Sequence, residues 1–303
     1  MSAQPARFDN RVAIVTGSGR GLGRQHALLL ASLGASVVVN STTQATAQGT
    51  VDDIVKAGGK AVACVGSVSD EAVAQALVKT AIDTFGRIDI LINNAGTYHL
   101  QPFEETTSAS LRDMYSLHVE GSYNVTRAAW PHMKNQKYGR IVMITSHTMF
   151  GMFGTGFYAG AKLALVGLAK AIAIEGEPHN ILVNSIATTA FTDTVEQHLP
   201  DENMAAFMKA NLPSSEPARA VVWLAHEDLK STGEIFGAQG RIVSRIFIAE
   251  TQGYHASSKG EWAVDSVRDN WDKVLDEKDY IVHKDANAVG AVLFGRLTQG
   301  PPQ

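Results

Sequence analysis

The chain has 303 residues, of which 45% are hydrophobic and 18% charged, a composition typical of a soluble globular protein. Its net charge of -4 provides no basic field, and we find no uninterrupted apolar stretch long enough to span a bilayer, so neither nucleic acid nor a membrane is an expected partner. The single cysteine, Cys64, excludes an internal disulfide and a multi-thiolate metal site, and no metal is expected.

Short β-branched runs alternate with longer helical stretches over residues 8–240. The runs expected to be strands are Val12–Thr16, Ser36–Asn40, Ala61–Val65, Ile88–Asn93, Arg140–Thr145 and Ile181–Ile186. The expected helices are Gly23–Leu33, Asp52–Ala57, Glu71–Phe85, Leu111–Lys134 and Gly156–Glu177, with a polar turn at Ser41–Thr50. Because the strands are nearly all apolar, helices should cover both faces of the sheet. The pattern predicts an α/β fold, a Rossmann-type doubly wound parallel sheet in a single domain, with residues 241–303 as a C-terminal extension that packs on the core or at a subunit interface.

A glycine-rich turn, TGSGRGLG, follows the first predicted strand and leads into the first helix. Glycines there let the backbone turn tightly and approach a pyrophosphate, which binds at the helix N-terminus. The position of the turn in the first βαβ unit is the context that this motif needs. We therefore predict dinucleotide binding rather than an unliganded turn. The residues expected to bind are Gly17, Ser18, Arg20, Gly21, Leu22 and Gly23.

The end of the second strand carries Asn40 and Ser41 where an NAD site usually has an acidic residue. No carboxylate would repel a 2′-phosphate there, and Arg20 and Ser41 can donate hydrogen bonds to one. The sequence therefore favours NADP. NAD stays the alternative if Arg20 is only a solvated side chain.

Tyr158 and Lys162 stand four residues apart in a predicted helix, so they share one face of it. A phenol titrates near ~10 and needs a nearby positive charge to exchange protons at neutral pH. Such a pair is more often packing beside a solvated ammonium. Here the glycine-rich turn and a hydroxyl cluster at the end of the preceding strand favour a catalytic role.

Four motifs in order resemble the short-chain dehydrogenase/reductase family over about residues 8–240: TGSGRGLG, NNAG at Asn93–Gly96, a strand ending in Ser146, and the helix with Tyr158 and Lys162. Within it, VTRAAWPHMKNQKYGRIVM, the segment Ala171–Gly176 and the extension past Gly240 resemble the (3R)-hydroxyacyl-CoA dehydrogenase unit of peroxisomal multifunctional enzymes, which also include 17β-hydroxysteroid dehydrogenase activity. The resemblance implies a nicotinamide cofactor, a secondary alcohol or ketone substrate, and a homodimer or homotetramer formed through the helices Leu111–Lys134 and Gly156–Glu177.

The resemblance also implies roles for single residues. Tyr158 would exchange a proton with the substrate oxygen, Lys162 would lower its pKa and bind the nicotinamide ribose, and Ser146 would hold the substrate oxygen. The cofactor would also contact Ser41, Ser67, Val68, Asn93, Asn94, Ala95, Gly96, Tyr158, Phe191 and Thr192.

The chain departs from the family pattern at several positions. The interval from Ser146 to Tyr158 is 12 residues instead of 13, which leaves Thr145 as a second choice for the substrate hydroxyl. His118 replaces an asparagine that is often the fourth catalytic member, and it would either relay a proton or be an ordinary hydrogen-bonded helix histidine. Thr188 and Thr189 replace a Pro-Gly pair, and the acidic residue that commonly binds adenine is missing.

The segment Met149–Phe157 and Phe191 predict a broad apolar wall at the substrate pocket, with core packing as the alternative. A CoA ester needs basic groups for its phosphates, but residues 188–213 carry only Lys209 against Asp193, Glu196, Asp201 and Glu202. The sequence thus favours a hydroxysteroid over a (3R)-hydroxyacyl-CoA. A non-catalytic dinucleotide-sensing protein is the alternative of another class.

The sequence gives an expectation for location as well. The N-terminus lacks the basic and then apolar pattern of a signal peptide, and Pro301, Pro302 and Gln303 match no peroxisomal signal of the Ser-Lys-Leu type. We expect a cytoplasmic protein.

Overall fold

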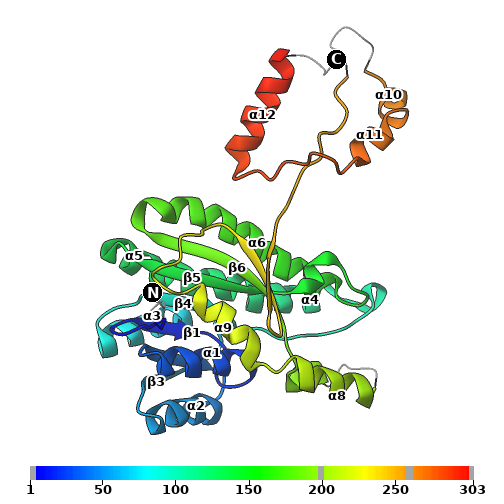
Figure 1. Ribbon diagram of the computed structural model, residues 1–303. Coiled ribbons are helices and arrows are strands. Elements are labelled where there is room, and N and C mark those ends of the chain that lie inside the picture. The colour runs from blue at the N-terminus through cyan, green and yellow to red at the C-terminus, as the bar shows by residue number, and fades with distance from the viewer. Residues whose placement is uncertain (1–4, 197–200, 257–261, 300–303) are drawn as a thin grey trace. The chain divides into compact units, whose positions relative to one another are not determined.

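The computed structural model describes residues 5–196, 201–256 and 262–299, and the chain divides into two compact units, Met1–Arg245 and Ile246–Gln303. The first contains an eight-stranded sheet in the order β3-β2-β1-β4-β5-β6-β7-β8 (Figure 1). The strands are β1 (Val12–Val15), β2 (Ser36–Ser41), β3 (Lys60–Val65), β4 (Ile90–Asn93), β5 (Gly139–Thr145), β6 (Ile181–Thr189), β7 (Ile235–Gln239) and β8 (Ile242–Ile246). The predicted α/β fold with a doubly wound sheet is confirmed.

The strand order reverses direction between β1 and β4. The pairs from β3 through β7 are all parallel, whereas β8 follows β7 after only two residues and therefore runs antiparallel to it. Where the order of parallel strands reverses, the loops at their carboxyl ends diverge and leave a crevice. The glycine-rich turn after β1 and the NNAG motif after β4 flank this crevice.

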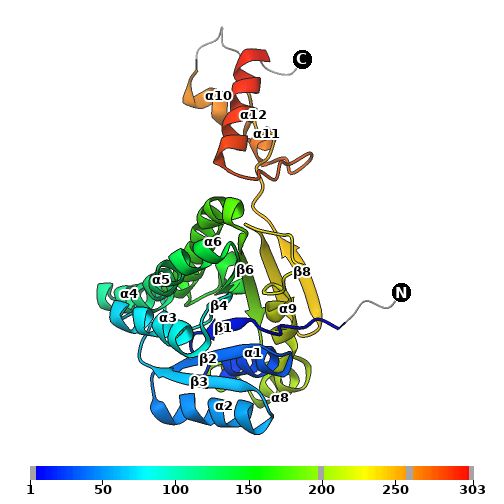
Figure 2. The same ribbon diagram turned by 90° about the vertical axis from the view of Figure 1, so that its left-hand side faces the viewer.

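Helices cover both faces of the sheet (Figure 2). One face packs against α1 (Gly21–Ser32), α2 (Gln44–Lys56) and α9 (Ser215–Trp223), and the other against α3 (Glu71–Phe85), α5 (Gly121–Gln136) and α6 (Gly156–Gly176). Alternation along β1 shows how the sheet separates two cores: Ala13 and Val15 belong to the first, Val12 and Ile14 to the second. Burial on both faces explains why the strands read as continuous apolar runs.

The helices differ from the predicted ones in two places. The helix expected at Asp52–Ala57 begins earlier, as α2 at Gln44, so the polar segment is mostly helix rather than a turn. Gln44, Thr46 and Gln48 are exposed and Thr50 is buried, so polar residues lie on both sides of the helix and the segment carries little apolar pattern. The helix expected at Leu111–Lys134 is α4 (Ser108–Tyr115), a π-helical turn η2 (Ser116–Glu120) and α5. That turn contains His118.

The remaining short elements connect these layers. They are η1 (Phe103–Glu105), η3 (His147–Phe150), η4 (Glu177–His179), α7 (Asp193–Glu196) and α8 (Glu202–Asn211). The helix α6 is apolar and long enough, together with η4, to span a membrane, contrary to the sequence expectation. However, it packs along β5 and β6 and has nine buried residues, as expected of a core helix.

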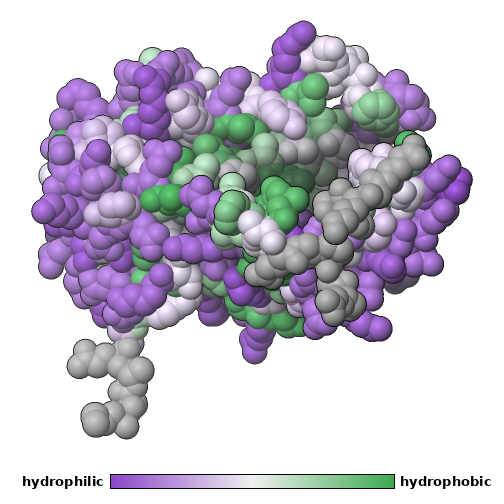
Figure 3. Space-filling model, turned by 90° about the horizontal axis from the view of Figure 1, so that it is seen from above, coloured by the Kyte–Doolittle hydropathy of each residue, from purple (hydrophilic) through white to green (hydrophobic). Residues whose placement is uncertain are grey.

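The second unit contains α10 (Val264–Arg268), α11 (Trp271–Leu275) and α12 (Ala286–Gln299). An antiparallel bridge between Glu250 and Ile281 joins the start of this unit to the segment before α12, and the rings of Phe247 and Tyr280 stack with centroids 5.6 Å apart. Leu293 and Phe294 on α12 are 54% and 71% exposed. On the face of the molecule seen in Figure 3, hydrophobic patches interrupt a mostly hydrophilic surface. The expectation that this extension packs on the core or at a subunit interface stays a prediction.

Candidate active site

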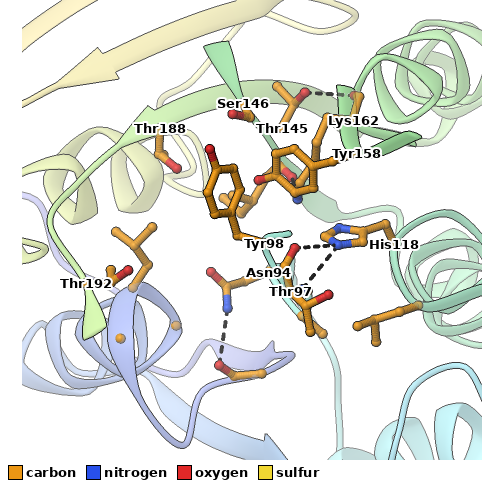
Figure 4. A pocket seen from close by; sticks show the side chains of 18 of the residues that line it. Asn94, Thr97, Tyr98, His118, Thr145, Ser146, Tyr158, Lys162, Thr188 and Thr192 are labelled. Atoms are coloured by element: carbon orange, nitrogen blue, oxygen red, sulfur yellow. Dashed lines mark hydrogen bonds between the residues drawn. The ribbon is translucent and has the colours of Figure 1, made fainter. Parts of the chain in front are cut away.

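A cavity of about 660 Å³ opens at the carboxyl ends of the strands. Its walls come from the loops after β1, β2, β3, β4, β5 and β6 and from α6 and η2 (Figure 4). The described residues that line it include Gly17, Arg20, Gly21, Leu22, Gly23, Ser41, Ser67, Val68, Asn94, Ala95, Gly96, His118, Thr145, Ser146, Tyr158, Lys162 and Thr192. Most of the residues predicted for the cofactor and the chemistry are thus brought to one place.

The glycine-rich turn fits closely against the loop after β4. Gly17 has φ +62°, and a Cβ atom there would lie 2.8 Å from the Cα of Ala95. A Cβ at Gly23 would lie 2.4 Å from the amide nitrogen of Asn94. Both positions therefore require glycine. No side chain caps the start of α1, so its first N–H groups stay available for an anion in the cavity, and the turn fits the pyrophosphate of a nicotinamide dinucleotide.

Asn94 ties the two loops together. Its amide donates to the backbone oxygens of Thr16 and Gly17 at 3.0 and 3.2 Å, and its backbone N–H donates to Thr16 Oγ1 at 2.9 Å. Asn93 has a different position: it is buried, and its amide donates to Thr126 Oγ1 on α5 at 2.9 Å. The motif therefore divides between one residue that supports the sheet and three that line the cavity.

Ser18 does not line the cavity. It is fully buried, and its hydroxyl donates to the backbone oxygen of Val15 at 2.6 Å, which holds the turn. Asn40 supports the same turn by accepting from the N–H of Gly17 at 3.1 Å. The hydroxyl of Ser18 is therefore not directed at the cofactor, because it satisfies a buried backbone carbonyl, and the predicted contact of Ser18 with the cofactor stays a prediction.

The far end of the cavity contains Arg20, Ser41 and Thr42. Ser41 Oγ lies 2.7 Å from Thr46 Oγ1 in a small hydroxyl cluster, and Arg20 has an exposed side chain with no ion-pair partner among the described residues. No Asp or Glu occurs among the described residues that line the cavity. This end therefore has a net positive charge.

Tyr158 and Lys162 project from one face of α6 into the cavity, and both are buried. The Lys162 ammonium lies 5.7 Å from the centre of the Tyr158 ring and donates to the backbone oxygen of Ile144 at 2.8 Å. Burial lowers the pKa of Lys162 to about 7 and raises the pKa of Tyr158 to about 12, although a hydrogen bond with Ser146 opposes the latter shift. Tyr158 is therefore a neutral proton donor at pH 7.

The two candidate hydroxyls at the end of β5 are used differently. Thr145 is buried, and its hydroxyl donates to the backbone oxygen of Lys162 at 2.7 Å. Ser146 is only partly buried, accepts from the N–H of Thr148 at 3.2 Å and bonds to Tyr158. Of the two, Ser146 is the hydroxyl beside the phenol. The short interval to Tyr158 is accommodated by the tight turn η3.

His118 lies in the π-helical turn and is 1% exposed. Its Nε2 lies 3.2 Å from the backbone nitrogen and 3.0 Å from the backbone oxygen of Thr97, and its Nδ1 has no partner among the described residues. Burial and the charge of Lys162 lower the pKa of His118 well below its usual value. The ring is therefore neutral near pH 7. Both expectations for His118, a relay or a bonded helix histidine, stay predictions.

Of the two predicted residues that follow β6, one lines the cavity and the other does not. Thr192 lines the cavity opposite the glycine-rich turn. Phe191 does not: its N–H donates to the backbone oxygen of Leu212 at 2.7 Å, in a bridge between Phe191 and Pro213. This bridge fixes the loop, and the predicted contact of Phe191 with the cofactor stays a prediction.

The apolar wall predicted from Met149–Phe157 and Phe191 is only partly present. Phe150 and Phe153 are 69% and 84% exposed and do not line the cavity, while Phe157 is buried beside Met114. Only Gly151 and Met152 of this segment reach the cavity wall.

Tyr98 and His147 line the cavity: His147 is expected from the sequence as a pocket or surface residue, whereas Tyr98 is not anticipated. The ring of Tyr98 meets that of Tyr158 edge to face with centroids 5.1 Å apart, and His147 Nδ1 lies 3.1 Å from Thr189 Oγ1. Tyr98 is on a loop and His147 begins the short turn η3, and neither segment has a periodic pattern. Only their nearness in sequence to NNAG and to Ser146 could have indicated them.

Known proteins resemble this chain in sequence and in fold. The family model described as short chain dehydrogenase matches residues 11–203. Peroxisomal multifunctional enzyme type 2 of Mus musculus is 39% identical over 90% of this chain, which spans 38% of the mouse protein. The (2S)-[(R)-hydroxy(phenyl)methyl]succinyl-CoA dehydrogenase subunit BbsD of Thauera aromatica is 34% identical over 73% of this chain and 91% of its own length.

Two solved structures are similar as well. Full-length peroxisomal multifunctional enzyme type 2 from Drosophila melanogaster matches with a TM-score of 0.82 and 32% identity, over 97% of this chain and 50% of that chain. A 7α-hydroxysteroid dehydrogenase in complex with NADH and 7-oxo glycochenodeoxycholic acid matches with a TM-score of 0.73 and 31% identity, over 77% of this chain and 94% of that chain.

Proposed function

The chain belongs to the short-chain dehydrogenase family and is an NAD(P)-dependent oxidoreductase, and from this premise we propose that it interconverts a secondary alcohol and a ketone on a hydroxyacyl thioester of coenzyme A. The observation that carries the proposal is the meeting of Tyr158, Lys162 and Ser146 in the cavity that the glycine-rich turn closes at its other end. A non-catalytic dinucleotide sensor would need no such set.

The nicotinamide ring supplies or accepts the hydride when the cofactor is bound. In ketone reduction Tyr158, neutral at pH 7, donates its proton to the substrate oxygen as that oxygen gains charge. Ser146 holds the same oxygen by a hydrogen bond, and Lys162 stabilises the phenolate that forms. In alcohol oxidation Tyr158 takes the hydroxyl proton, so the phenol must first ionise.

The proposal reverses the order of substrates that the sequence favours. The acidic residues after β6 argued against a CoA ester, but none of those described lines the cavity. Asp201 instead caps α8 by accepting from the N–H of Met204 at 2.8 Å, and Glu202 is exposed. The absence of the phenylalanine wall also weakens the case for a steroid. The Thauera relative, whose name specifies a CoA ester, supports the thioester.

Initial rates with a medium-chain (3R)-3-hydroxyacyl-CoA, its (3S) epimer and a 17β-hydroxysteroid test this proposal, each with NADP⁺ and NAD⁺. We expect turnover of the (3R) ester, with the (3S) epimer as the matched control. Oxidation of the steroid alone would restore the hydroxysteroid as the favoured substrate over the (3R)-hydroxyacyl-CoA. Oxidation of none of the three would remove the substrate proposal altogether.

We also propose that NADP is the preferred cofactor. Its support is Arg20 beside Ser41 and Thr42 at a cavity end where no described lining residue is a carboxylate, so that a 2′-phosphate can accept from a guanidinium and hydroxyls. Fluorescence titration with NADPH and NADH compares the two directly. Tighter binding of NADH would contradict the proposal.

A cytoplasmic location remains our proposal, although similar proteins carry names that place them in peroxisomes. Imaging of the tagged protein beside a peroxisomal marker tests it, and coincidence with the marker would refute it.

A further inference from the structure

The catalytic phenol is held between two other rings. Tyr98 meets Tyr158 with ring centroids 5.1 Å apart at 87°, and His118 meets the same ring at 5.5 Å and 84° (Figure 4). Edge-to-face geometry at these separations is the favoured arrangement of aromatic pairs. Tyr98 lies on the loop after β4 and His118 in the π-helical turn, so two elements that are not part of α6 fix the ring.

Tyr98 is also the part of this support that shields the phenol on the cavity side. It lines the cavity and is half-buried, whereas His118 is 1% exposed and belongs to the floor. The other members of the small apolar cluster around Tyr158 lie on α4, η2 and α6: buried Met114, Phe157 and Ala161, and partly buried Tyr115 and Val119. If the Tyr98 ring were absent, water could reach Tyr158 from the cavity and the ring could rotate.

We propose that Tyr98 is a positioning residue, whose ring holds the Tyr158 phenol in its reactive orientation and excludes water from it. The inference rests on the proposed function for its kinetic consequence. The inference itself concerns the position and hydration of the Tyr158 side chain, and both can be measured without a substrate.

The groups that face Tyr158 define the expected pH behaviour. They are Lys162 on α6, Ser146 after β5, His118 in η2 and Tyr98. Burial is the largest cause of the raised pKa of Tyr158, so the ring of Tyr98, by excluding water, should keep the phenol protonated. The hydroxyl of Tyr98 should contribute less, because burial raises the pKa of Tyr98 too and keeps it neutral.

The experiment compares Tyr98→Ala, which removes the ring, with Tyr98→Phe, which keeps it. Tyrosines labelled with ¹³C at Cζ report the ionisation of Tyr158 by NMR, and Tyr158→Phe assigns its signal. We expect the wild-type phenol to stay protonated up to about pH 10, and Tyr98→Ala to lower its pKa by at least about one unit. Tyr98→Phe should behave as wild type.

Turnover supplies the second readout. Tyr98→Ala should lower kcat about tenfold with little change in the Kd of NADPH, and Tyr98→Phe should restore it, since misplacement of a reacting group slows chemistry rather than binding. Tyr115→Phe is the matched control, because Tyr115 packs in the same cluster but does not line the cavity. An unchanged Tyr158 titration in Tyr98→Ala would overturn the inference even if the wild type is active. A shifted titration in an enzyme that turns over no alcohol would instead leave this inference intact and reject the proposed function.

Discussion

At the scale of single residues, burying the Lys162 ammonium in the site lowers the free energy of unfolding. The ammonium is buried with a pKa of about 7, far below the usual 10.5. Between these two values the unfolded chain keeps a proton that the folded chain has lost, so this residue makes stability rise with pH over that window. Below pH 7 the full cost of burying the charge is present.

The first prediction follows from that sign. Lys162→Met removes the buried charge, so it should raise Tm at pH 6 by a few degrees, given about 2–4 °C per kcal/mol for a chain of this size, and abolish turnover. The gain should shrink as the pH approaches 10. Thermal unfolding of both proteins between pH 6 and 10 measures it. A lower Tm at pH 6 would show that the ammonium stabilises the fold.

The hydroxyls of Thr145 and Ser146 should separate structure from chemistry. Thr145→Val loses a buried bond to the backbone of Lys162, so it should cost about 1 kcal/mol of unfolding free energy and leave most of the activity. Ser146→Ala should lower kcat about 100-fold with the stability nearly unchanged. Urea unfolding and steady-state rates of both variants test this. If Thr145→Val lowered kcat instead and Ser146→Ala lowered the unfolding free energy, the substrate hydroxyl would be that of Thr145.

The residues that sequence reasoning placed in the cavity are those whose chemistry follows from spacing. Tyr158 and Lys162 share a helix face, and the glycines stand at a strand-to-helix turn. Ser18 and Phe191 do not line the cavity, and their positions in the chain do not say so: the Ser18 hydroxyl donates to a backbone oxygen, and the Phe191 N–H donates to Leu212. Tyr98 was missed because its partner is 60 residues away.

At the scale of elements, the π-helical turn η2 shows how a helix and a loop are fitted together. It brings His118 against the NNAG loop, where a Cβ at Gly96 would lie 2.3 Å from the imidazole Cε1. An apolar pattern along Leu111–Lys134 predicts one continuous helix, because one extra residue in a turn barely changes the pattern. The interruption therefore could not be read from periodicity.

The close contact between Gly96 and His118 gives a prediction about cofactor binding. Gly96→Ala should push the loop from His118 and weaken binding of NADPH at least about tenfold, since the loop also holds the glycine-rich turn through Asn94. His118→Ala in the same chain should recover much of the loss by making room. Gly49→Ala on α2, where a Cβ would have no neighbour within 4 Å, is the control. Equal binding by Gly96→Ala and wild type would refute the fit.

At the scale of the whole molecule, the sheet and its two helical layers were predictable because doubly covered strands must be apolar throughout. The antiparallel β8 and the order in the second unit were not, since after Gly240 the chain has no repeated strand and helix pattern. How that extension packs still depends on what covers its exposed apolar side chains, Leu293 and Phe294 among them.

The oligomer is the prediction that belongs to this scale. Leu163 and Ile174 on α6 are 45% and 50% exposed on one of the helices expected to form the subunit interface. Ile174→Glu should therefore lower the mass measured by light scattering after size exclusion from that of a dimer or tetramer toward a monomer. Val55→Glu on α2, at 54% exposure, should leave it unchanged. A monomeric wild type would contradict the prediction.

The central claim is that Tyr158 exchanges the proton in this cavity, and Tyr158→Phe tests it most directly. The change removes one oxygen from a ring that its neighbours hold, so the cofactor site should be unaffected. We predict a loss of turnover of about 10²–10⁴-fold with the Kd of NADPH unchanged, while Tyr123→Phe on the exposed side of α5 keeps full activity. Undiminished turnover by Tyr158→Phe would contradict the account.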